Sequence, residues 1–325
     1  MTRANIPTLH IVGQSIPQAY FRAIKAVWGN GLPIRTEYDR KNEAGEFIDP
    51  PSRDATVMIE VTDPMSQPRF APLSFCEIGA YIAEILGAKN HHIVPMDILK
   101  LARRGTPLPD TKWPYTYNQR ITDHPDINGF TTNQLELAIE RLAETPFTRR
   151  AVVTTSIPNI DPYLQEDVPC LRELMFRCTE DNGTLFLNTY ASWRSRDLYK
   201  AWGDNMIGIT FWLQTIAKRL AEKTGKPVQV GRYAETSASL HIYGQDFGHV
   251  GGSEENDLKS IFETFDEDGF IARSLSSDMA GPMLVIPQLM ELLSEKQREQ
   301  WKFPKESIEL IEGIIFRIQS GELIA

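Results

Sequence analysis

The stretch Val168–Asn205, VPCLRELMFRCTEDNGTLFLNTYASWRSRDLYKAWGDN, decides how this chain folds. Two apolar runs, Glu173–Cys178 and Leu185–Tyr190, flank the sequence Asp181-Asn182-Gly183, which is a strong turn signal. The stretch therefore predicts a β-hairpin. The hairpin begins just after Cys170, which follows a proline, and it leads into a dense cluster of polar residues.

The polar cluster after the hairpin combines guanidinium groups, a hydroxyl, a carboxylate and an amide. Its members are Arg194, Ser195, Arg196, Asp197 and Asn205. A second arginine pair, Arg149-Arg150, directly precedes the strand-like run 151–156. Arginine forks match the geometry of a phosphate, and a hydroxyl adds a donor. Although an arginine pair alone is usually a solvated surface feature, the combination predicts a monophosphate site.

Cys170 has two interpretations. A cysteine is most often a small buried apolar residue. As a nucleophile, it needs positive charge nearby, because positive charge favours the thiolate. Arg194 and Arg196, across the hairpin, are expected to supply that charge. Cys76 and Cys178 are predicted to be packing residues.

Composition limits the possible partners. The chain has 325 residues, 42% of them hydrophobic, and a formal net charge of −9. This acidity argues against a nucleic-acid scaffold, because a phosphate polymer needs a basic face, but it does not exclude a small phosphorylated ligand. Three cysteines without metal-ligand spacing predict a reduced, cytoplasmic protein without a metal site. The N-terminus lacks a signal-peptide pattern, and no apolar run approaches a membrane span.

Hydrophobic periodicity predicts one mixed α/β domain over residues 1–325, because no repeat or linker interrupts the chain. Besides the hairpin, the expected strands are Leu9–Val12, Thr56–Val61, Ala151–Ser156, Val228–Tyr233 and Ser239–Tyr243. The expected helices are Pro17–Trp28, Leu73–Leu86, Thr132–Ala143, Asn205–Lys223, Pro287–Lys302 and Lys305–Ser320. Residues 35–54 are expected to form a mobile loop, residues 89–112 to be irregular, and residues 250–281 to be polar surface structure.

Two aromatic motifs have both a structural and a functional interpretation. His241 and Tyr243 are two residues apart on a predicted strand, so their side chains face the same way. They form either a half-buried polar strand face or a pair that holds a sugar hydroxyl or an ordered water. Tyr117, in WPYTYNQRI, is either part of a pocket wall or an ordinary strand aromatic.

Five of these motifs occur in the order seen in thymidylate synthases. They are FTRRAVV at 147–153, PC at 169–170, RSRD at 194–197, Asn205 and HIY at 241–243. The resemblance covers roughly residues 113–247, and its motif style is closest to the archaeal-type branch. The wider family includes the pyrimidine nucleotide hydroxymethylases. The resemblance implies a large mixed β-sheet with flanking helices and a homodimer joined sheet to sheet.

The resemblance also implies a role for each matching residue. Cys170 would add to C6 of a pyrimidine nucleotide, Tyr117 would lie beside it, and Asp197 would face the pterin of 5,10-methylenetetrahydrofolate, the co-substrate. The 5′-phosphate would be held by Arg194, Ser195 and the pair Arg149-Arg150, which in this family comes from the neighbouring subunit. Asn205 would bind the base edge, and His241 and Tyr243 the sugar hydroxyl.

Some assignments stay open at this point. A helix glutamate organises the proton-transfer water in this family, and Glu84 is favoured over Glu77. The N-terminal phosphate-loop arginine is assigned to Arg35, with Arg53 as the alternative. The apolar tail 322–325 either closes over the folate or is a frayed terminus.

The chain departs from the family pattern in three places. Leu171 stands where the common bacterial enzymes have histidine, and the spacing from Cys170 to Arg194 is a few residues longer. The tryptophan-rich segment before Tyr117 is not recognisable, although Trp113 partly replaces it. The missing segment leaves the fate of the transferred carbon open.

The expected activity is transfer of a one-carbon unit from methylenetetrahydrofolate to C5 of a pyrimidine nucleoside 5′-monophosphate. Thymidylate synthesis from dUMP is the first expectation, because the amide of Asn205 suits uracil. A hydroxymethylase acting on dUMP, dCMP or CMP is the second, since the adjacent carboxylate of Asp204 would suit cytosine. A silent relative that only binds nucleotide is the third.

Overall fold

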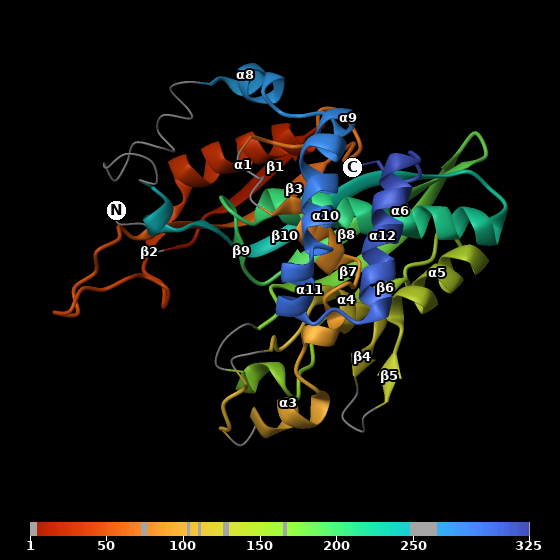
Figure 1. Cartoon of the computed structure of the whole chain (residues 1–325). Coiled ribbons are helices and arrows are strands. Elements are labelled where there is room, and N and C mark those ends of the chain that lie inside the picture. The colour runs from red at the N-terminus through yellow and green to blue at the C-terminus, as the bar shows by residue number, and fades with distance from the viewer. Residues whose placement is uncertain are drawn as a thin grey trace. The chain divides into compact units, whose positions relative to one another are not determined.

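The structure is a computed structural model that describes residues 5–72, 77–102, 105–109, 112–125, 130–164, 168–247 and 265–324 (Figure 1). The chain divides into two compact units, each built from three segments. Unit 1 comprises Met1–Phe75, Ser192–Met206 and Arg232–Ser276. Unit 2 comprises Cys76–Ala191, Ile207–Gly231 and Ser277–Ala325. A single domain over the whole chain stays a prediction.

Unit 1 contains a mixed sheet with the strand order β1-β3-β10. Its strands are β1 (Thr8–Gly13), β2 (Leu32–Ile34), β3 (Ser52–Val61), β9 (Arg196–Asp197) and most of β10 (Val228–Ile242). β1 runs parallel to β3, whereas β10 runs antiparallel to β3 and parallel to β9. The sequence predicted two strands where β10 is one, because the register shifts between Ser237 and Leu240 and interrupts the alternation.

Helix α1 (Ile16–Asn30) covers β1 and β3 (Figure 1). Its N-cap is Ser15, whose hydroxyl accepts a hydrogen bond from the backbone N–H of Gln18. Tyr20, Ile24 and Val27 are fully buried, so the predicted apolar stripe faces the core. Among the described residues, the other helices of unit 1 are α8 (Glu267–Ala272), the short η3 (Gly244–Asp246) and the first turn of α6 (Trp202–Thr224).

Unit 2 contains the hairpin predicted from the sequence. β7 (Leu171–Asp181) and β8 (Thr184–Trp193) flank Asn182 and Gly183, which have φ values of 47° and 80°. Positive φ at both turn residues suits asparagine and glycine, so the turn sequence sets the register of the two strands. The strand order in this unit is β10-β8-β7-β6, with β6 at Val152–Thr154 and Val228–Gly231 of β10 at the other edge.

The helices that the structure describes in unit 2 flank this sheet (Figure 1). They are α2 (Ile78–Ile85), η1 (Asn90–His92), α3 (Met96–Ala102), α4 (Tyr117–Thr122), α5 (Gln134–Glu144), η2 (Asp161–Tyr163), most of α6, α9 (Ser277–Ala280), the π-helix η4 (Gly281–Val285), α10 (Ile286–Leu292), α11 (Glu295–Trp301) and α12 (Lys305–Gln319). A small two-stranded sheet pairs β4 (His124–Pro125) with β5 (Thr131–Thr132). α10 packs against α2 and α12.

Three local predictions were wrong. Residues 89–112 are not irregular throughout, because η1 and α3 lie within them. The single helix expected at Pro287–Lys302 is two helices, since α10 ends at Leu292 and Ser294 caps α11 by accepting from the N–H of Gln297. Of the two interpretations of Tyr117, only the ordinary strand aromatic is wrong, because Tyr117 begins a helix.

Several expected segments lie partly outside the described residues, including residues 103–104 and 110–111 of the segment 89–112. Of the helix expected at Leu73–Leu86, residues 73–76 are outside, and Cys76 is among them. Of the polar segment 250–281, residues 250–264 are outside, and α8 and α9 lie in the remainder. Among the helices that the structure describes, none is long and apolar enough to cross a membrane.

Candidate active site

The candidate residues fall into two groups, one on each unit. Unit 2 carries the proposed nucleophile and its neighbours, Cys170, Tyr117, Glu84, Arg149 and Arg150. Unit 1 carries the remaining candidates, Arg35, Arg194, Ser195, Asp197, Asn205, His241 and Tyr243.

Cys170 lies immediately before β7, between the buried Pro169 and Leu171. It is half-buried and is not in a disulfide. Cys178, further along β7, is buried, and burial raises the pKa of its thiol to about 11. A thiol with so high a pKa stays protonated at neutral pH. The structure therefore agrees with Cys178 as a packing residue and leaves Cys170 as the reactive candidate on this strand.

Tyr117 lies beside Cys170. The backbone N–H of Leu171 donates to the Tyr117 hydroxyl over 3.4 Å, so the phenol reaches the residue after the cysteine. Tyr117 is the first residue of α4, whose N-cap Thr116 accepts from the N–H of Gln119 and donates to Asn90 Oδ1. These cap contacts hold the start of the helix, and with it the ring of Tyr117.

Glu84 and Tyr117 line the same pocket of about 210 Å³. The other lining residues are Trp113, Pro114, Tyr115 and Thr116. Burial raises the pKa of Glu84, and the nearby Lys89 opposes this rise. Glu77, by contrast, is exposed just before α2 and does not line the pocket. Of the two glutamates, Glu84 is therefore the one that shares a pocket with Tyr117, and its role stays a prediction.

Lys89 is a neighbour of Glu84 that sequence reasoning missed. Its ammonium lies 3.5 Å from Glu84 Oε2, 4.6 Å from the ring centroid of Trp301 and 5.3 Å from that of Trp113. Aromatic faces attract a cation, so the two indoles hold Lys89 in place. Trp113 is four residues from Tyr117 in sequence, but Trp301 is far away, so no local pattern reveals this arrangement.

Arg149 and Arg150 are exposed and precede β6. Within this segment, the N–H of Arg150 donates to the Thr148 hydroxyl, and Arg141 Nη1 donates to the carbonyl oxygen of Arg150. These contacts fix the backbone of the pair and leave its orientation toward a partner subunit as a prediction.

On unit 1, Arg194 and Ser195 form the link between β8 and β9, with Arg194 exposed and Ser195 half-buried. Their backbone is anchored on both sides, because Trp193 and Arg196 are each 2% exposed. The guanidinium of Arg196 lies 4.0 Å from the ring centroid of Trp193 and is ion-paired with Glu235. Arg196 is therefore not available to activate the Cys170 thiol, and that expectation is corrected.

Glu235 is the centre of this buried network. Besides Arg196, it accepts hydrogen bonds from Trp202 Nε1 over 2.9 Å and from the Tyr233 hydroxyl over 2.8 Å. A buried charge is tolerated when it is paired and its remaining lone pairs are satisfied. The network thus holds the strand that follows Arg194 and Ser195.

Asp197 closes a turn. Its Oδ1 accepts from the backbone N–H groups of Tyr199 and Lys200, each over 3.0 Å. Burial raises the pKa of Asp197 to about 6, although these hydrogen bonds oppose the rise. One carboxylate oxygen is therefore committed to the fold, and the expected contact with a pterin stays a prediction.

Asn205 lies in the first turns of α6 and is 9% exposed. The preceding residue, Asp204, is half-buried, and its Oδ1 has no hydrogen-bond partner among the described residues. Burial raises the pKa of Asp204 to about 6. The carboxylate of Asp204 and the amide of Asn205 are thus adjacent in α6, and the choice between a uracil and a cytosine base stays open.

His241 is the last residue but one of β10, and Tyr243 follows the strand. Their ring centroids lie 4.5 Å apart, with the ring planes at 70°. The residue after Tyr243 must be glycine, because a Cβ atom on Gly244 would lie 1.7 Å from the carbonyl oxygen of Pro50. Burial lowers the pKa of His241 to about 4, and the charge of Arg194 lowers it further. The proximity of that charge places His241 near the proposed phosphate-binding arginine.

The two alternatives for the N-terminal arginine are both engaged locally. Arg35 donates to the carbonyl oxygen of Asp49 over 2.6 Å, pairs with Asp39 and covers the ring of Phe47. The guanidinium of Arg53 lies 5.7 Å from the ring centroid of Trp28. Arg35 thus organises the segment between β2 and β3, and its phosphate contact stays a prediction.

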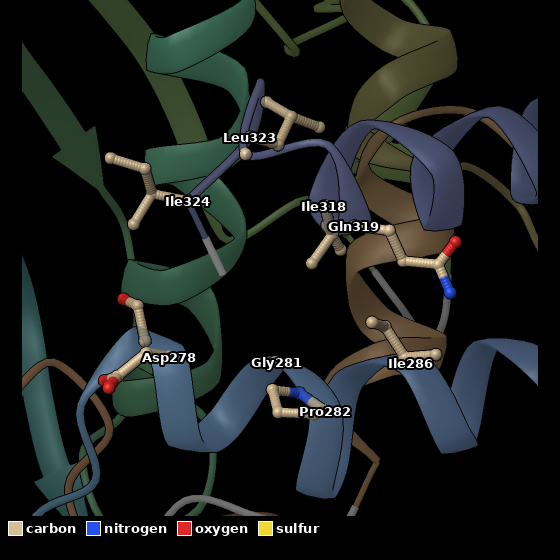
Figure 2. Close-up of a pocket in the computed structure, with 10 residues that line it drawn as sticks. Asp278, Gly281, Pro282, Ile286, Ile318, Gln319, Leu323 and Ile324 are labelled. Atoms are coloured by element: carbon tan, nitrogen blue, oxygen red, sulfur yellow. The ribbon is translucent and has the colours of Figure 1, made fainter.

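The chain's tail is docked through residue Ile324, so the frayed-terminus alternative is wrong for the described part. Ile324 exchanges two backbone hydrogen bonds with the side-chain amide of Gln214, of 2.7 and 3.0 Å. Leu323 and Ile324 help to line a second pocket of unit 2, of about 560 Å³, together with the end of α12 and the helices around η4 (Figure 2). Ala325 lies outside the described residues.

The chain has sequence relatives among archaeal proteins named putative thymidylate synthase, and no family model matches it. The protein from Methanothermobacter marburgensis is 38% identical over 133 residues, which are 41% of this chain and 52% of that protein. The chain thus aligns with only about half the length of this relative. The protein from Methanosarcina mazei is 28% identical over 253 residues, which cover 77% of this chain and 95% of that protein.

A solved structure extends the similarity to the fold. The thermostable thymidylate synthase A from Bacillus subtilis superposes with a TM-score of 0.51, at 17% sequence identity, over 77% of this chain and 84% of that one. This comparison confirms the predicted α/β fold with a mixed sheet and flanking helices. In its sequence relatives and in its fold, the chain is thymidylate synthase-like, as the order of its motifs predicted.

Proposed function

We propose that this protein transfers a one-carbon unit from 5,10-methylenetetrahydrofolate to C5 of a pyrimidine nucleoside 5′-monophosphate, with dUMP as the first choice. The observation that carries the proposal is the group on unit 2. There Tyr117 touches the residue after Cys170 and shares a pocket with Glu84. The similarity to proteins named putative thymidylate synthase supports it.

The proposed roles follow from chemistry. C5 of a pyrimidine is a poor nucleophile, and addition of the Cys170 thiolate at C6 makes it an enolate carbon that attacks the one-carbon unit. Glu84, through water, assists removal of the C5 proton, and Tyr117 orders the groups around the thiol. Methylenetetrahydrofolate supplies the carbon as a co-substrate, and the proposal needs no metal.

The groups on unit 1 are proposed to bind the nucleotide. Arg194 and Ser195 hold the phosphate, because a guanidinium and a hydroxyl donate to its oxygens. Asn205 binds the base edge, and His241 and Tyr243 bind the sugar. Arg149 and Arg150 complete the phosphate site from the second subunit of a homodimer. A reducing, cytosolic location stays a prediction from the cysteine count.

A second candidate is a hydroxymethylase acting on a cytosine or uracil nucleotide. One observation favours cytosine: the Oδ1 atom of Asp204 is buried without a partner in the described part of the chain. A carboxylate accepts from the exocyclic amine of cytosine, whereas the amide of Asn205 can both donate to O4 and accept from N3–H of uracil. A silent, nucleotide-binding relative is a third candidate.

Mass spectrometry of the products separates these functions. The protein is incubated with methylenetetrahydrofolate and, separately, with dUMP, dCMP and CMP, with Cys170→Ala as the control. A methylated product from dUMP together with dihydrofolate is the expected result. A hydroxymethylated product would identify the second function and its base. Nucleotide binding without any product would indicate a silent relative.

A further inference from the structure

Ser239 and Asp54 of unit 1 form a short hydrogen-bonded chain that ends at Nδ1 of His241. Ser239 Oγ lies 3.2 Å from His241 Nδ1 and donates to Asp54 Oδ2 over 2.6 Å. The histidine is 5% exposed, and its other ring nitrogen, Nε2, has no hydrogen-bond partner among the described residues. Nδ1 therefore contacts the protein through Ser239, whereas Nε2 is buried without a hydrogen-bond partner among the described residues.

The sheet explains why these three residues meet. Ser239 lies in the irregular segment of β10, where the register shifts between Ser237 and Leu240, and its hydroxyl lies 3.2 Å from Nδ1 of His241, two residues further along. In the antiparallel pair of β10 and β3, His241 stands opposite Asp54. The ring of Tyr243 packs edge-on against that of His241, at 4.5 Å, and restricts its orientation. The arrangement is thus built into two paired strands and not into a loop.

The position of the protons follows from the donors. A serine hydroxyl has one proton, and here it goes to the carboxylate of Asp54, so the oxygen presents lone pairs to His241. Nδ1 of His241 must then carry the ring proton. Burial keeps the imidazole neutral, because it lowers the pKa of His241 to about 4. A hydrogen bond of the ring to the backbone of Ser239 opposes this lowering of the pKa, the charge of Arg194 adds to it, and that of Glu37 opposes it. A neutral ring with a proton on Nδ1 has an acceptor at Nε2.

We propose that Ser239 and Asp54 are positioning residues that hold His241 as the Nδ1–H tautomer, so that Nε2 accepts a hydrogen bond from a hydroxyl of the bound nucleotide. This inference rests on the proposed function and adds to it a source of specificity. In a 2′-deoxynucleoside 5′-monophosphate, the 3′-hydroxyl is the only free hydroxyl of the sugar. A ligand without it leaves a buried acceptor unpaired, and such a loss weakens binding about tenfold or more.

The first test needs no ligand. Nitrogen NMR of uniformly labelled protein distinguishes the two histidine tautomers, and His241→Gln assigns the signal among the six histidines. The wild type is expected to show Nδ1–H, Ser239→Thr to retain it, and Ser239→Ala and Asp54→Ala to shift the population toward Nε2–H. An Nε2–H tautomer in the wild type, or no change in Ser239→Ala, would overturn the relay.

The second test measures the specificity. Calorimetric titration compares dUMP with 2′,3′-dideoxyuridine 5′-monophosphate. The wild type and Ser239→Thr are expected to bind dUMP about tenfold or more tightly than the dideoxy analogue, and Ser239→Ala to lose most of that preference. Equal affinity for both nucleotides in the wild type would overturn the proposed acceptor role. If neither nucleotide binds, the proposed function fails and the acceptor role with it, while the NMR result still decides the relay.

Discussion

The half-buried Asp204 and the buried His241 are two groups of unit 1 whose pKa values move in opposite directions for the same reason. Burial disfavours the charged form, so it raises the pKa of the carboxyl to about 6 and lowers that of the imidazole to about 4. Each also has a polar atom without a hydrogen-bond partner among the described residues. In our account these atoms form hydrogen bonds with the bound nucleotide, and their lack of a partner lowers the stability of the free protein.

Replacing Asp204 by Asn is expected to stabilise the protein in the absence of ligand. Because the pKa of Asp204 rises from 3.8 in the unfolded chain to about 6 in the folded one, its ionised form costs stability above pH 6. The gain is on the order of 2 kcal/mol at about pH 8. It should shrink as pH falls from 6 to 4, where the carboxyl becomes protonated in both states.

Urea unfolding of the free protein across this pH range measures the effect. Asp181→Asn is the matched control, since Asp181 is exposed at the hairpin turn. A gain for Asp204→Asn that does not depend on pH would contradict the assignment of the cost to the buried charge.

At the level of single residues, the sequence showed which groups carry chemistry but not what surrounds them. Cys170 and Tyr117 stood out from their motifs, and the structure brings them together. Ser239 could have been found, because it is two residues from His241 on a predicted strand. Asp54 could not, since its proximity depends on the pairing of β3 with β10 across more than 180 residues.

Glu84 lines the pocket between α2 and α4, and Lys89 contacts both Glu84 and the rings of Trp113 and Trp301. Lys89 favours the carboxylate form of Glu84, against the burial that raises its pKa. If Glu84 works as the ionised base, activity falls as pH drops through this pKa. Removing the lysine charge should therefore move the acidic limb of the activity profile to higher pH.

Lys89→Met is the variant that tests this coupling, with Lys112→Met, an exposed lysine of the same segment, as its control. The pH dependence of kcat/KM is expected to shift upward on its acidic side in the first variant alone. Glu84→Gln should lower kcat at every pH. An acidic limb that stays in place in Lys89→Met would separate Glu84 from that ionisation.

The buried pair of Arg196 and Glu235 is expected to stabilise unit 1 strongly. Glu235→Gln leaves the guanidinium of Arg196 buried without its charge partner, which costs about 3–5 kcal/mol. The double variant Arg196→Met with Glu235→Leu, which removes both charges, should recover much of the lost stability. Chemical denaturation measures both, and a single variant within 1 kcal/mol of the wild type would be inconsistent with this network.

At the level of elements, local patterns were predicted well and long-range arrangements were not. The hairpin of β7 and β8 and the stripe of α1 follow from turn chemistry and periodicity, and the structure confirms both. The burial of Arg196 was missed because its partner lies 39 residues away. The bulge in β10 broke an alternation that sequence reasoning interpreted as two strands.

At the level of the whole molecule, the exposed Arg149 and Arg150 raise the question of whether an active site needs two subunits. The resemblance implies that they reach the phosphate site of a second subunit, so an active site would need two chains. Arg149→Ala and Cys170→Ala, each inactive alone, are then expected to regain activity when mixed, up to about a quarter of the wild-type level if subunits exchange at random.

Activity of the mixture is measured after subunit exchange has been established with differently labelled chains. Cys178→Ala mixed with Cys170→Ala is the control for dilution, because Cys178 is a buried packing residue. No recovery with Arg149→Ala under conditions of exchange would mean that the arginine and the thiol act within one chain.

The central claim is that Cys170 forms a covalent bond to the nucleotide, and mass spectrometry of the rapidly quenched protein tests it most directly. With dUMP and methylenetetrahydrofolate, our account predicts a mass increase equal to the nucleotide, with or without the folate. Peptide mapping should place it on Cys170, and Cys170→Ala should show none. An adduct on another residue, or full turnover by Cys170→Ala, would contradict the account.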